Sequence, residues 1–399
     1  MPASRTGLEH DDLLEGLTML GLAGLIDPPR EEAVEAVREC AGAGIQVKMI
    51  TGDHLETARA IGRRMGISDG ALAMDGRQID ALDDDALREK VQECNIYART
   101  SPEHKLRLVR ALQAGGKICA MTGDGVNDAP ALKMADIGIA MGIKGTEVTK
   151  EAAEIVLADD NFQTIAAAVE EGRKVYDNLR KTLLFILPTN LAEGLLIVVS
   201  ILFGSIAVLT PVQVLWVNMV TTVTISFALA FEPLEPCAML RKPRPPTEPL
   251  LGAYFLFRII YVGLVMGGAC LVLSFYTLDL SAISEAAYQT IMVQTLVVCE
   301  CLYLFNVRHI TEPAFNRQFF QNRVTFLVLG ILVLLQAFAT YVPFMNRALG
   351  TAPLTAEQWI PPFLVALILF CAVEIEKAVT RALLRRKAGD SGVPCAAQL

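Results

Sequence analysis

The stretch Lys117–Leu132, with the sequence KICAMTGDGVNDAPAL, is the strongest indication of how the first part of this 399-residue chain folds. It begins as a short apolar run and ends in a glycine-flanked turn that carries Asp124, Asn127 and Asp128. Because Pro130 suits the first turn of a helix, the pattern predicts a strand, a loop and a helix. Two carboxylates on one turn are hard oxygen ligands, and Mg²⁺ prefers a few carboxylates together with phosphate oxygens. Glycines let backbone N–H groups approach an anion, so the sequence predicts a site for magnesium and phosphate here.

The same pattern recurs through residues 1–175. Short apolar runs predict strands at Met19–Ile26, Ile45–Ile50, Lys117–Met121 and Ile137–Met141. Helical spacing predicts helices at Glu31–Ala43, 55–65 and 129–134. Repeated strand–loop–helix units indicate an α/β domain in which helices cover both faces of a parallel sheet. Ligands of such sheets bind at the carboxyl ends of the strands, which is where the two Gly-Asp motifs fall.

The second Gly-Asp motif is Thr51-Gly52-Asp53, after the predicted strand Ile45–Ile50. A threonine hydroxyl and backbone N–H groups at this position suit a phosphoryl oxygen, and Lys105 could neutralise its charge. Gly-Asp is also a common turn pair, so ordinary turn chemistry remains the alternative for this motif taken alone.

The second part of the chain is mostly apolar. The whole sequence is 53% hydrophobic and 20% charged, which favours membrane segments, and its net charge of -8 argues against a nucleic-acid partner. Six stretches are close to the roughly 20 residues that a bilayer requires. They are 183–203, 211–231, 255–276, 289–306, 324–343 and 362–380. We therefore expect a six-helix all-α bundle in a lipid bilayer; buried core helices of a soluble protein are the alternative.

Basic residues are concentrated in alternate loops of this second part. One set of polar segments carries Arg173, Lys174, Arg180, Lys181, Arg241, Lys242, Arg244, Arg308, Arg317, Arg323, Arg381, Arg385, Arg386 and Lys387. The intervening segments, near 204–210, 277–288 and 344–361, carry only Arg347. Because basic loops stay in the cytoplasm, we expect a multi-pass protein of the cell membrane with the α/β domain and both termini cytoplasmic.

Polar residues inside the predicted spans indicate a path for a cation. Asn190 and Glu193 lie three residues apart, and three residues place two side chains on neighbouring positions of a helix face. Polar groups inside a membrane are costly and usually functional. The second span adds oxygens from Asn218, Thr221 and Thr222. Hydrogen bonding between helices is the alternative, and it suits a lone Asn or Thr better than a Glu close to Pro188.

These motifs resemble P-type ATPases, whose phosphorylation domain is a branch of the haloacid-dehalogenase superfamily. The similar segments are Asp27–Arg30, Thr51–Asp53, Pro102–Lys105, Thr122–Leu132 and Leu157–Phe162. The resemblance extends over essentially the whole chain, with the six spans being similar to the last six of a calcium-type pump. It implies a haloacid-dehalogenase-like (Rossmannoid) fold for residues 1–175, a transmembrane domain at 176–385 and a cytoplasmic tail at 386–399.

The resemblance also implies roles for individual residues, with ATP and Mg²⁺ as cofactors. Asp124 would ligate Mg²⁺, with Asp128 and Asn127 supporting the metal and phosphate. Lys105 would contact the phosphoryl group. Thr51 and Gly52 would bind its oxygens, and Asp53 would order their loop. The transported cation would be held by Asn190, Glu193, Asn218, Thr221 and Thr222.

The sequence departs from the family in two ways. In the family, the aspartate that becomes phosphorylated lies in an Asp-Lys-Thr-Gly-Thr motif, and these 399 residues lack that motif. We therefore expect turnover only in a complete pump, or when the other part is supplied as a partner. In calcium-type pumps the second ion helix carries Asn-x-x-Thr-Asp, whereas Thr222 replaces that Asp here. The change favours a single Ca²⁺, or another ion, over two.

The sequence leaves three interpretations of the chain open. The chain is a pump fragment, a membrane-tethered phosphatase of the dehalogenase superfamily, or a truncated protein without catalytic activity. Glu300 lies between Cys299 and Cys301 in the fourth predicted span. Thiolates suit soft metals, but six spans differ from the heavy-metal branch, so structural thiols are the favoured interpretation.

Overall fold

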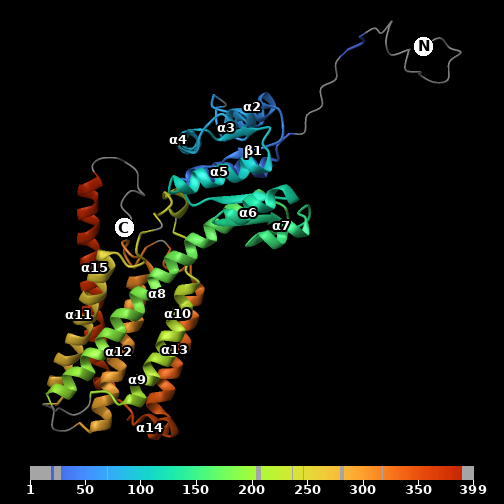
Figure 1. Ribbon diagram of the computed structural model, residues 1–399. Helices are drawn as coiled ribbons and strands as arrows, with labels where there is room; N and C mark the ends of the chain where they lie inside the picture. Colours follow the sequence, from blue (N-terminus) through green and yellow to red (C-terminus); the bar gives the residue numbers. More distant parts are fainter. Residues whose placement is uncertain are drawn as a thin grey trace. The chain divides into compact units, whose positions relative to one another are not determined.

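The computed structural model describes residues 19–21, 28–69, 71–203, 208–235, 237–245, 247–278, 283–316 and 318–388. The chain forms two compact units (Figure 1). The first holds Lys48–Cys119 with the described residues before Ala36, and the second holds Ala36–Val47 and the chain from Ala120 onward. The strand predicted at Met19–Ile26 lies mostly outside the described residues, as does Asp27; residues 19–21 have no regular secondary structure.

The first unit is a small α/β structure. Its elements are the start of α1 (Glu31–Gly42), β1 (Met49–Ile50), α2 (Leu55–Arg64), β2 (Met74–Asp75), α3 (Gly76–Asp80), α4 (Asp84–Glu93), β3 (Ile96–Ala98) and α5 (Pro102–Ala114). The strands pair in the order β1-β3-β2, and both pairs are parallel. All three residues of β3 are buried, as expected for a central strand covered on both faces. The parallel arrangement and the predicted helices α1 and α2 are confirmed, whereas β2 and β3 were not predicted.

Lys48 connects the end of α4 to the start of β1. Its Nζ donates to the carbonyl oxygens of Val91 (2.5 Å) and Cys94 (2.7 Å) and to Oδ1 of Asn95 (2.9 Å). Carbonyls at a helix C-terminus have no partner within the helix, and a cation there is favourable. Burial of the ammonium group lowers the pKa of Lys48 to about 8. This contact fixes the start of β1, which delivers the Thr51 loop.

The α/β part of the second unit also alternates strands and helices around a parallel sheet. It comprises β4 (Ala120–Gly123), α6 (Ala129–Met134), β5 (Ile137–Met141), α7 (Glu147–Ala152) and β6 (Ile155–Leu157). The strands pair in the order β4-β5-β6, again all parallel. Both α6 and β5 have the predicted bounds, while the strand expected at Lys117–Met121 begins later. The described strands therefore form two three-stranded sheets, one in each unit, rather than one sheet.

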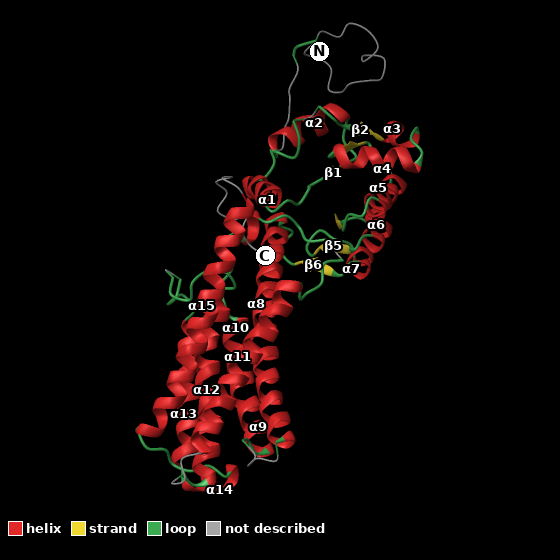
Figure 2. Cartoon of the chain, turned by 90° about the vertical axis from the view of Figure 1, so that its left-hand side faces the viewer, coloured by secondary structure: helices red, strands yellow, loops and turns green. Residues whose placement is uncertain are grey.

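Long apolar helices make up the rest of the second unit. They are α8 (Phe162–Leu202), α9 (Pro211–Val217), a π-helical segment at Asn218–Thr222, α10 (Val223–Ala230), α11 (Ala253–Leu278), α12 (Glu285–Arg308), α13 (Arg323–Tyr341), α14 (Pro343–Leu349) and α15 (Ile360–Ala388). In Figure 2 the long helices run side by side as a bundle. Among the described residues, five helical spans are long and apolar enough to cross a membrane: α8, α9–α10 together, α11, α12 and α13.

Helix α15 covers the sixth predicted span but is not among those five. Its second half carries Glu374, Glu376 and Lys377. These charges are paired inside the bundle: Nζ of Lys377 lies 2.7 Å from Oε1 of Glu374, and Tyr254 donates to Oε1 of Glu376 at 2.9 Å. Apolar residues of its first half, such as Leu369, join the buried core of the bundle. Packing thus compensates for a composition that is too polar for an isolated span.

Two glycines of α11 allow close packing against α8. A Cβ at Gly263 would lie 2.7 Å from Cδ2 of Leu191, and one at Gly267 would lie 3.2 Å from Cα of Ala192. Small residues at such contacts let helix backbones approach closely in membranes. Glu193, the residue after Ala192 in α8, is buried and only 4% exposed.

Candidate functional site

The Thr51 loop is anchored to the loop that follows β3. Because β1 and β3 are parallel, both loops leave the same edge of the sheet. The Thr51 carbonyl accepts from the N–H of Thr100 (3.3 Å), and the Asp53 carbonyl accepts from the N–H of Arg99 (3.1 Å). The Thr51 hydroxyl donates to Asp53 Oδ2 (3.0 Å) and accepts from the Asp53 N–H (3.2 Å). Among the described residues the exposed N–H of Gly52 has no partner, so this loop presents a donor toward solvent.

Lys105 lies in the first turn of α5, whose start is well defined. Ser101 caps the helix: its hydroxyl accepts from the N–H of His104 (3.3 Å), and Nδ1 of His104 accepts from the N–H of Ser101 (3.0 Å). Nε2 of His104 also lies 2.8 Å from Oδ1 of Asp80. The N-terminus of a helix attracts anions. A half-buried lysine there is therefore in a suitable place to contact a phosphoryl group.

The loop after β4 carries the carboxylates of the second unit. Asp128 is buried, and its Oδ2 accepts from the N–H of Gly125 at 3.4 Å. Asp124 is exposed, and its backbone carbonyl is held by the N–H of Thr146 (3.0 Å) and the hydroxyl of Thr149 (3.3 Å). One carboxylate is thus fixed and the other points outward. This donor set fits Mg²⁺, which takes few protein carboxylates and completes its shell with water and phosphate.

The predicted catalytic residues divide between the two units. Thr51, Gly52, Asp53 and Lys105 belong to the first unit, whereas Asp124, Asn127 and Asp128 belong to the second. Within the described part of the chain, no three His, Cys, Asp or Glu side chains form a cluster that could hold a metal by themselves. The roles of these residues toward Mg²⁺ and phosphate stay a prediction.

Glu193 forms the centre of the candidate cation site in the bundle. Nδ2 of Asn218 donates to Oε2 of Glu193 at 2.6 Å, which joins α8 to the π-helical segment. Oε1 of Glu193 is buried and has no hydrogen-bond partner among the described residues. A buried carboxylate oxygen without a partner is costly unless a cation binds it.

The π-helical segment positions three of the predicted ligands. A single π turn inside an α-helix is often found at functional sites. The Thr222 hydroxyl donates to Oδ1 of Asn218 at 3.5 Å, and the Thr221 hydroxyl donates to the carbonyl of Val217 at 2.7 Å. Thr221 is fully buried. Asn218, Thr221 and Thr222 therefore face the interior or its edge, and their role toward a cation stays a prediction.

Glu300 of α12 is a residue of this site that the sequence interpretation did not include. Its side chain is only 2% exposed, it lies within reach of the Thr221 hydroxyl, and its charge interacts with that of Glu193. Oε2 of Glu300 is also buried without a partner in the described residues. Two carboxylates from different helices thus converge on one polar region. The signal for Glu300 was a glutamate inside an apolar span, but Cys299 and Cys301 on either side favoured an interpretation as structural thiols.

Asn190 lies apart from this group. It is exposed, and no hydrogen bond of its side chain occurs among the described residues, whereas Glu193 is buried. A spacing of three residues turns a helix by less than a full turn, so two such side chains can fall on either side of a burial boundary. The chain therefore brings Asn218 to Glu193 but does not bring Asn190 to it, and the role of Asn190 stays a prediction.

Pro188 lies five residues before Glu193 and interrupts the hydrogen bonds of α8. A proline has no N–H, so the carbonyl of Leu184 loses its partner four residues on. The hydroxyl of Tyr303 in α12 donates to that carbonyl at 2.9 Å. Both Tyr303 and Pro188 are buried. The interruption next to the candidate site is thus supported by a side chain from a neighbouring helix, as membrane proteins require.

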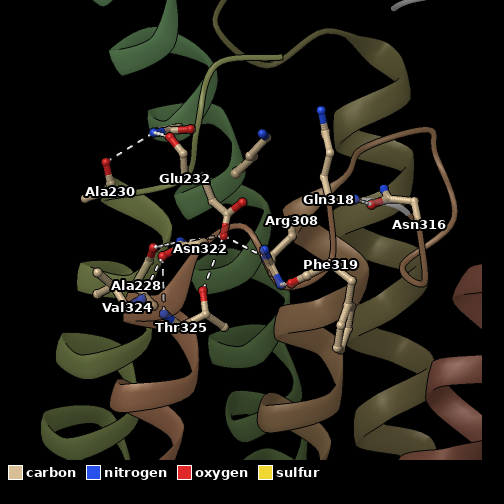
Figure 3. Close-up of polar contacts among 12 residues, drawn as sticks. Ala228, Ala230, Glu232, Arg308, Asn316, Gln318, Phe319, Asn322, Val324 and Thr325 are labelled. Carbon is tan, nitrogen blue, oxygen red and sulfur yellow. Dashed lines mark hydrogen bonds and ion pairs between the residues drawn. The ribbon is translucent and has the colours of Figure 1, made fainter. Parts of the chain in front are cut away.

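A buried ion pair fixes the end of α10, the helix that continues the π-helical segment (Figure 3). Nε of Arg308 lies 2.7 Å from Oε1 of Glu232, and each side chain is 2% exposed. The same oxygen accepts from Nδ2 of Asn322 (2.7 Å) and from the hydroxyl of Thr325 (3.3 Å). Arg308 also donates to the carbonyl of Phe319 at 2.8 Å. The pair thereby connects α10, α12 and α13 at one end of the bundle.

Comparison with protein families matches both parts of the chain. Residues 206–379 match a family described as "Cation transporting ATPase, C-terminus", and residues 5–136 match "haloacid dehalogenase-like hydrolase". The matched ranges cover most of the apolar helices and both Gly-Asp loops.

The chain is also similar to individual proteins that are named cation-transporting or calcium-transporting ATPases. The chain is 44% identical over 370 residues to a "Probable cation-transporting ATPase F" of Mycobacterium tuberculosis, covering 92% of this chain and 41% of that protein. It is 44% identical over 362 residues to "Cation-transporting ATPase pma1" of Synechocystis, covering 88% and 40%. It is 41% identical over 361 residues to a "Calcium-transporting ATPase" of Bacillus subtilis, covering 88% and 40%. The chain thus spans about two fifths of the length of these relatives. It belongs to the P-type cation-transporting ATPases and corresponds to their C-terminal part.

Proposed function

We propose that this chain supplies the ion-binding helices and the magnesium and phosphate loops of an ATP-driven cation pump. In the pump, formation and hydrolysis of an aspartyl phosphate are coupled to ion transport across the membrane. The observation that carries the proposal is the pair of buried carboxylates, Glu193 and Glu300, each with one oxygen lacking a partner among the described residues. The proposal keeps the division into 1–175, 176–385 and 386–399, with the first and last parts in the cytoplasm.

A cation is the ligand that this polar region can accept. Two carboxylates that share a buried region repel one another, and a divalent ion relieves both that repulsion and the cost of burying them. Oxygen atoms of Asn218, Thr221 and Thr222 would complete the shell, with Asn190 as a further predicted ligand. An all-oxygen set suits Ca²⁺. The relative in Bacillus subtilis is named a calcium-transporting ATPase, which also supports Ca²⁺ as the first ion to test.

The two loops of the α/β region would handle ATP and its phosphate. Bound Mg²⁺ would neutralise charge on the transferred phosphoryl group. Asp124, with support from Asp128 and Asn127, would hold the metal. Because Asp128 is already fixed by the loop, little reorganisation would be needed when the metal binds.

The remaining loop residues would orient the phosphoryl group. The N–H of Gly52 would donate to its oxygens, and the hydroxyl of Thr51 would do so after turning away from Asp53 Oδ2. Asp53 would maintain the loop, and Lys105 would neutralise charge. The aspartate that becomes phosphorylated is not among these 399 residues, because no Asp-Lys-Thr-Gly-Thr motif occurs in them. Activity of the pump therefore requires a further polypeptide segment.

The test is divalent-cation binding to the purified chain in detergent, with Ca²⁺ as the probe and isothermal titration calorimetry as the readout. Glu193→Gln and Glu300→Gln should each weaken Ca²⁺ binding by at least about tenfold, because losing a charged partner costs about 1.5–3 kcal/mol. Glu285→Gln is the matched control, since Glu285 is an exposed carboxylate at the other end of α12. Equal affinities for all four proteins would remove Glu193 and Glu300 from the ion site.

A second measurement separates the pump from a membrane-tethered phosphatase. The chain alone should incorporate no label from γ-labelled ATP, whereas a complete pump containing it should form a phosphoenzyme whose level depends on the cation. Glu193→Gln in the complete pump should weaken that cation dependence. Incorporation of label by the chain alone would contradict the proposal. A phosphoenzyme level in the complete pump that does not change with the cation would contradict it as well.

A further inference from the structure

Arg180 is a buried arginine that neither of these proposed sites uses. It lies in α8, just before the apolar part of that helix begins, and its side chain is 7% exposed. The guanidinium carbon is 4.0 Å from the ring centroid of Phe255 and 5.8 Å from that of Tyr176. Aromatic faces attract a cation but do not use its hydrogen-bond donors.

No carboxylate pairs with Arg180 in the described part of the chain. Asp177, one turn away on the same helix, forms its ion pair with Arg241. Glu248 contributes to the electrostatic field at Arg180 but forms no ion pair with it. The Nε atom is buried and has no hydrogen-bond partner among the described residues. The neighbouring Lys181, by contrast, is paired with Glu235 at 3.2 Å. A buried, unpaired guanidinium is costly, and a bound anion would offset that cost.

A second arginine lies beside the same aromatic residue. The guanidinium carbon of Arg244 is 3.2 Å from the ring centroid of Tyr176, and its side chain is exposed. Tyr176 thus has Arg180 and Arg244 near its ring. Two arginines with free donor groups are suited to the oxygens of a phosphate, which guanidinium groups bind in a bidentate manner.

The position of this pair matches a membrane surface. Arg180 comes shortly before the predicted span 183–203, and Phe255 is at the start of α11. Leu256 and Phe257, the next two residues of α11 after Phe255, are 55% and 57% exposed, so this end of the helix offers apolar side chains. Aromatic and basic residues are typical of the interface between lipid tails and headgroups.

We propose that Arg180 and Arg244 bind the phosphate group of an anionic phospholipid headgroup, with Leu256 and Phe257 contacting its acyl chains. A free phosphate ion would satisfy the arginines but would leave the exposed apolar residues at the start of α11 uncovered. The proposal depends on membrane insertion of the chain and does not depend on pump activity. The lipid would neutralise Arg180 and stabilise the contact between the middle of α8 and the start of α11.

Native mass spectrometry of the purified chain in detergent tests the proposal. Phosphatidylglycerol, phosphatidylcholine with the same acyl chains, and inorganic phosphate serve as the three probes. The chain should retain phosphatidylglycerol in preference to the other two. Arg180→Gln should weaken this binding by about tenfold, which is about 1.4 kcal/mol, since it removes one bidentate arginine–phosphate contact. Arg244→Gln should weaken it less, because Arg244 is exposed.

Arg323→Gln is the matched control. Arg323 is an exposed arginine at the first residue of α13, in another of the basic segments, and its loss should leave phosphatidylglycerol binding unchanged. If the Arg180→Gln protein does not fold, the test uses phosphatidylglycerol binding by the Arg244→Gln protein, because Arg244 is exposed. The proposal is overturned if inorganic phosphate competes as well as the lipid, if both lipids bind equally, or if the Arg244 and Arg323 variants lose the same affinity.

Discussion

Gly123 shows how one small residue shapes the loop that carries Asp124 and Asp128. A Cβ at position 123 would lie 2.5 Å from the Cβ of Asp128, closer than side-chain atoms can approach. Gly123→Ala should therefore displace Asp128 and lower the free energy of unfolding by about 1–3 kcal/mol. Thermal unfolding in detergent measures the change.

Gly172→Ala is the control for that substitution. Gly172 lies in α8 with no atom within 4 Å of a built Cβ. An alanine in an exposed helix position should raise stability by about 0.5–1 kcal/mol. If the two variants unfold at the same temperature, the close contact between Gly123 and Asp128 is not a constraint.

His309, just after α12, makes the stability of the bundle depend on pH. The pKa of His309 is lowered to about 3, with burial as the largest cause. The positive charges of Lys181, Arg308 and Lys377 also lower this pKa, while the negative charge of Glu374 acts in the opposite direction. In the unfolded chain the pKa is about 6.5. The unfolded chain thus binds more protons between these values, so this contribution is present above about pH 6.5 and lost as the pH falls toward 3. His309→Gln should flatten the fall in unfolding temperature between pH 7 and pH 5; an unchanged slope would contradict the assignment.

The comparison of Glu193 with Glu300 shows what can be predicted about single residues. Both are glutamates inside apolar stretches, which marks each as unusual. Spacing along one helix cannot tell which side chains of different helices meet, because that depends on how the helices pack. Asn190 illustrates the same limit, since it lies only three residues from Glu193 and is nevertheless exposed.

Tyr303 of α12 donates to the Leu184 carbonyl of α8, which Pro188 leaves without its helical donor. Tyr303→Phe removes the donor to the Leu184 carbonyl and should lower stability by about 1–3 kcal/mol, the cost of leaving a buried acceptor without a partner. In a Pro188→Ala background the backbone N–H that the substitution restores can donate to that carbonyl instead. The same Tyr303→Phe change should then cost clearly less.

A double-mutant cycle of these two substitutions gives the coupling energy directly. Thermal or denaturant unfolding in one detergent supplies the four stabilities. Additive effects would mean that Tyr303 does not compensate for Pro188. The π-helical segment at Asn218–Thr222 is a similar case, since an interruption of regular helix lies beside the candidate site.

The arrangement of the whole bundle decides whether α15 crosses the membrane. Glu374, Glu376 and Lys377 make its sequence too polar for an isolated span, yet they are paired within the bundle. We predict that Thr355, before α15, and Arg386, near its end, lie on opposite sides of the membrane. Thr355→Cys should react with a membrane-impermeant maleimide from outside intact cells, and Arg386→Cys only after the membrane is opened. Both positions are exposed, and the unsubstituted chain supplies the background. Labelling of both from the same side would show that α15 does not cross.

The sequence alone determined the class of each part of the chain: alternating strands and helices with Gly-Asp loops, then apolar stretches long enough for a bilayer. These features are local, because they depend on spacing, turn residues and the length of apolar runs. Only the tertiary structure decided that Glu300 joins Glu193 while Asn190 does not, that Tyr303 supports the helix at Pro188, and that Arg180 is buried without an ion pair. Each of these depends on side chains far apart in the sequence, and their contacts follow from how whole helices pack together.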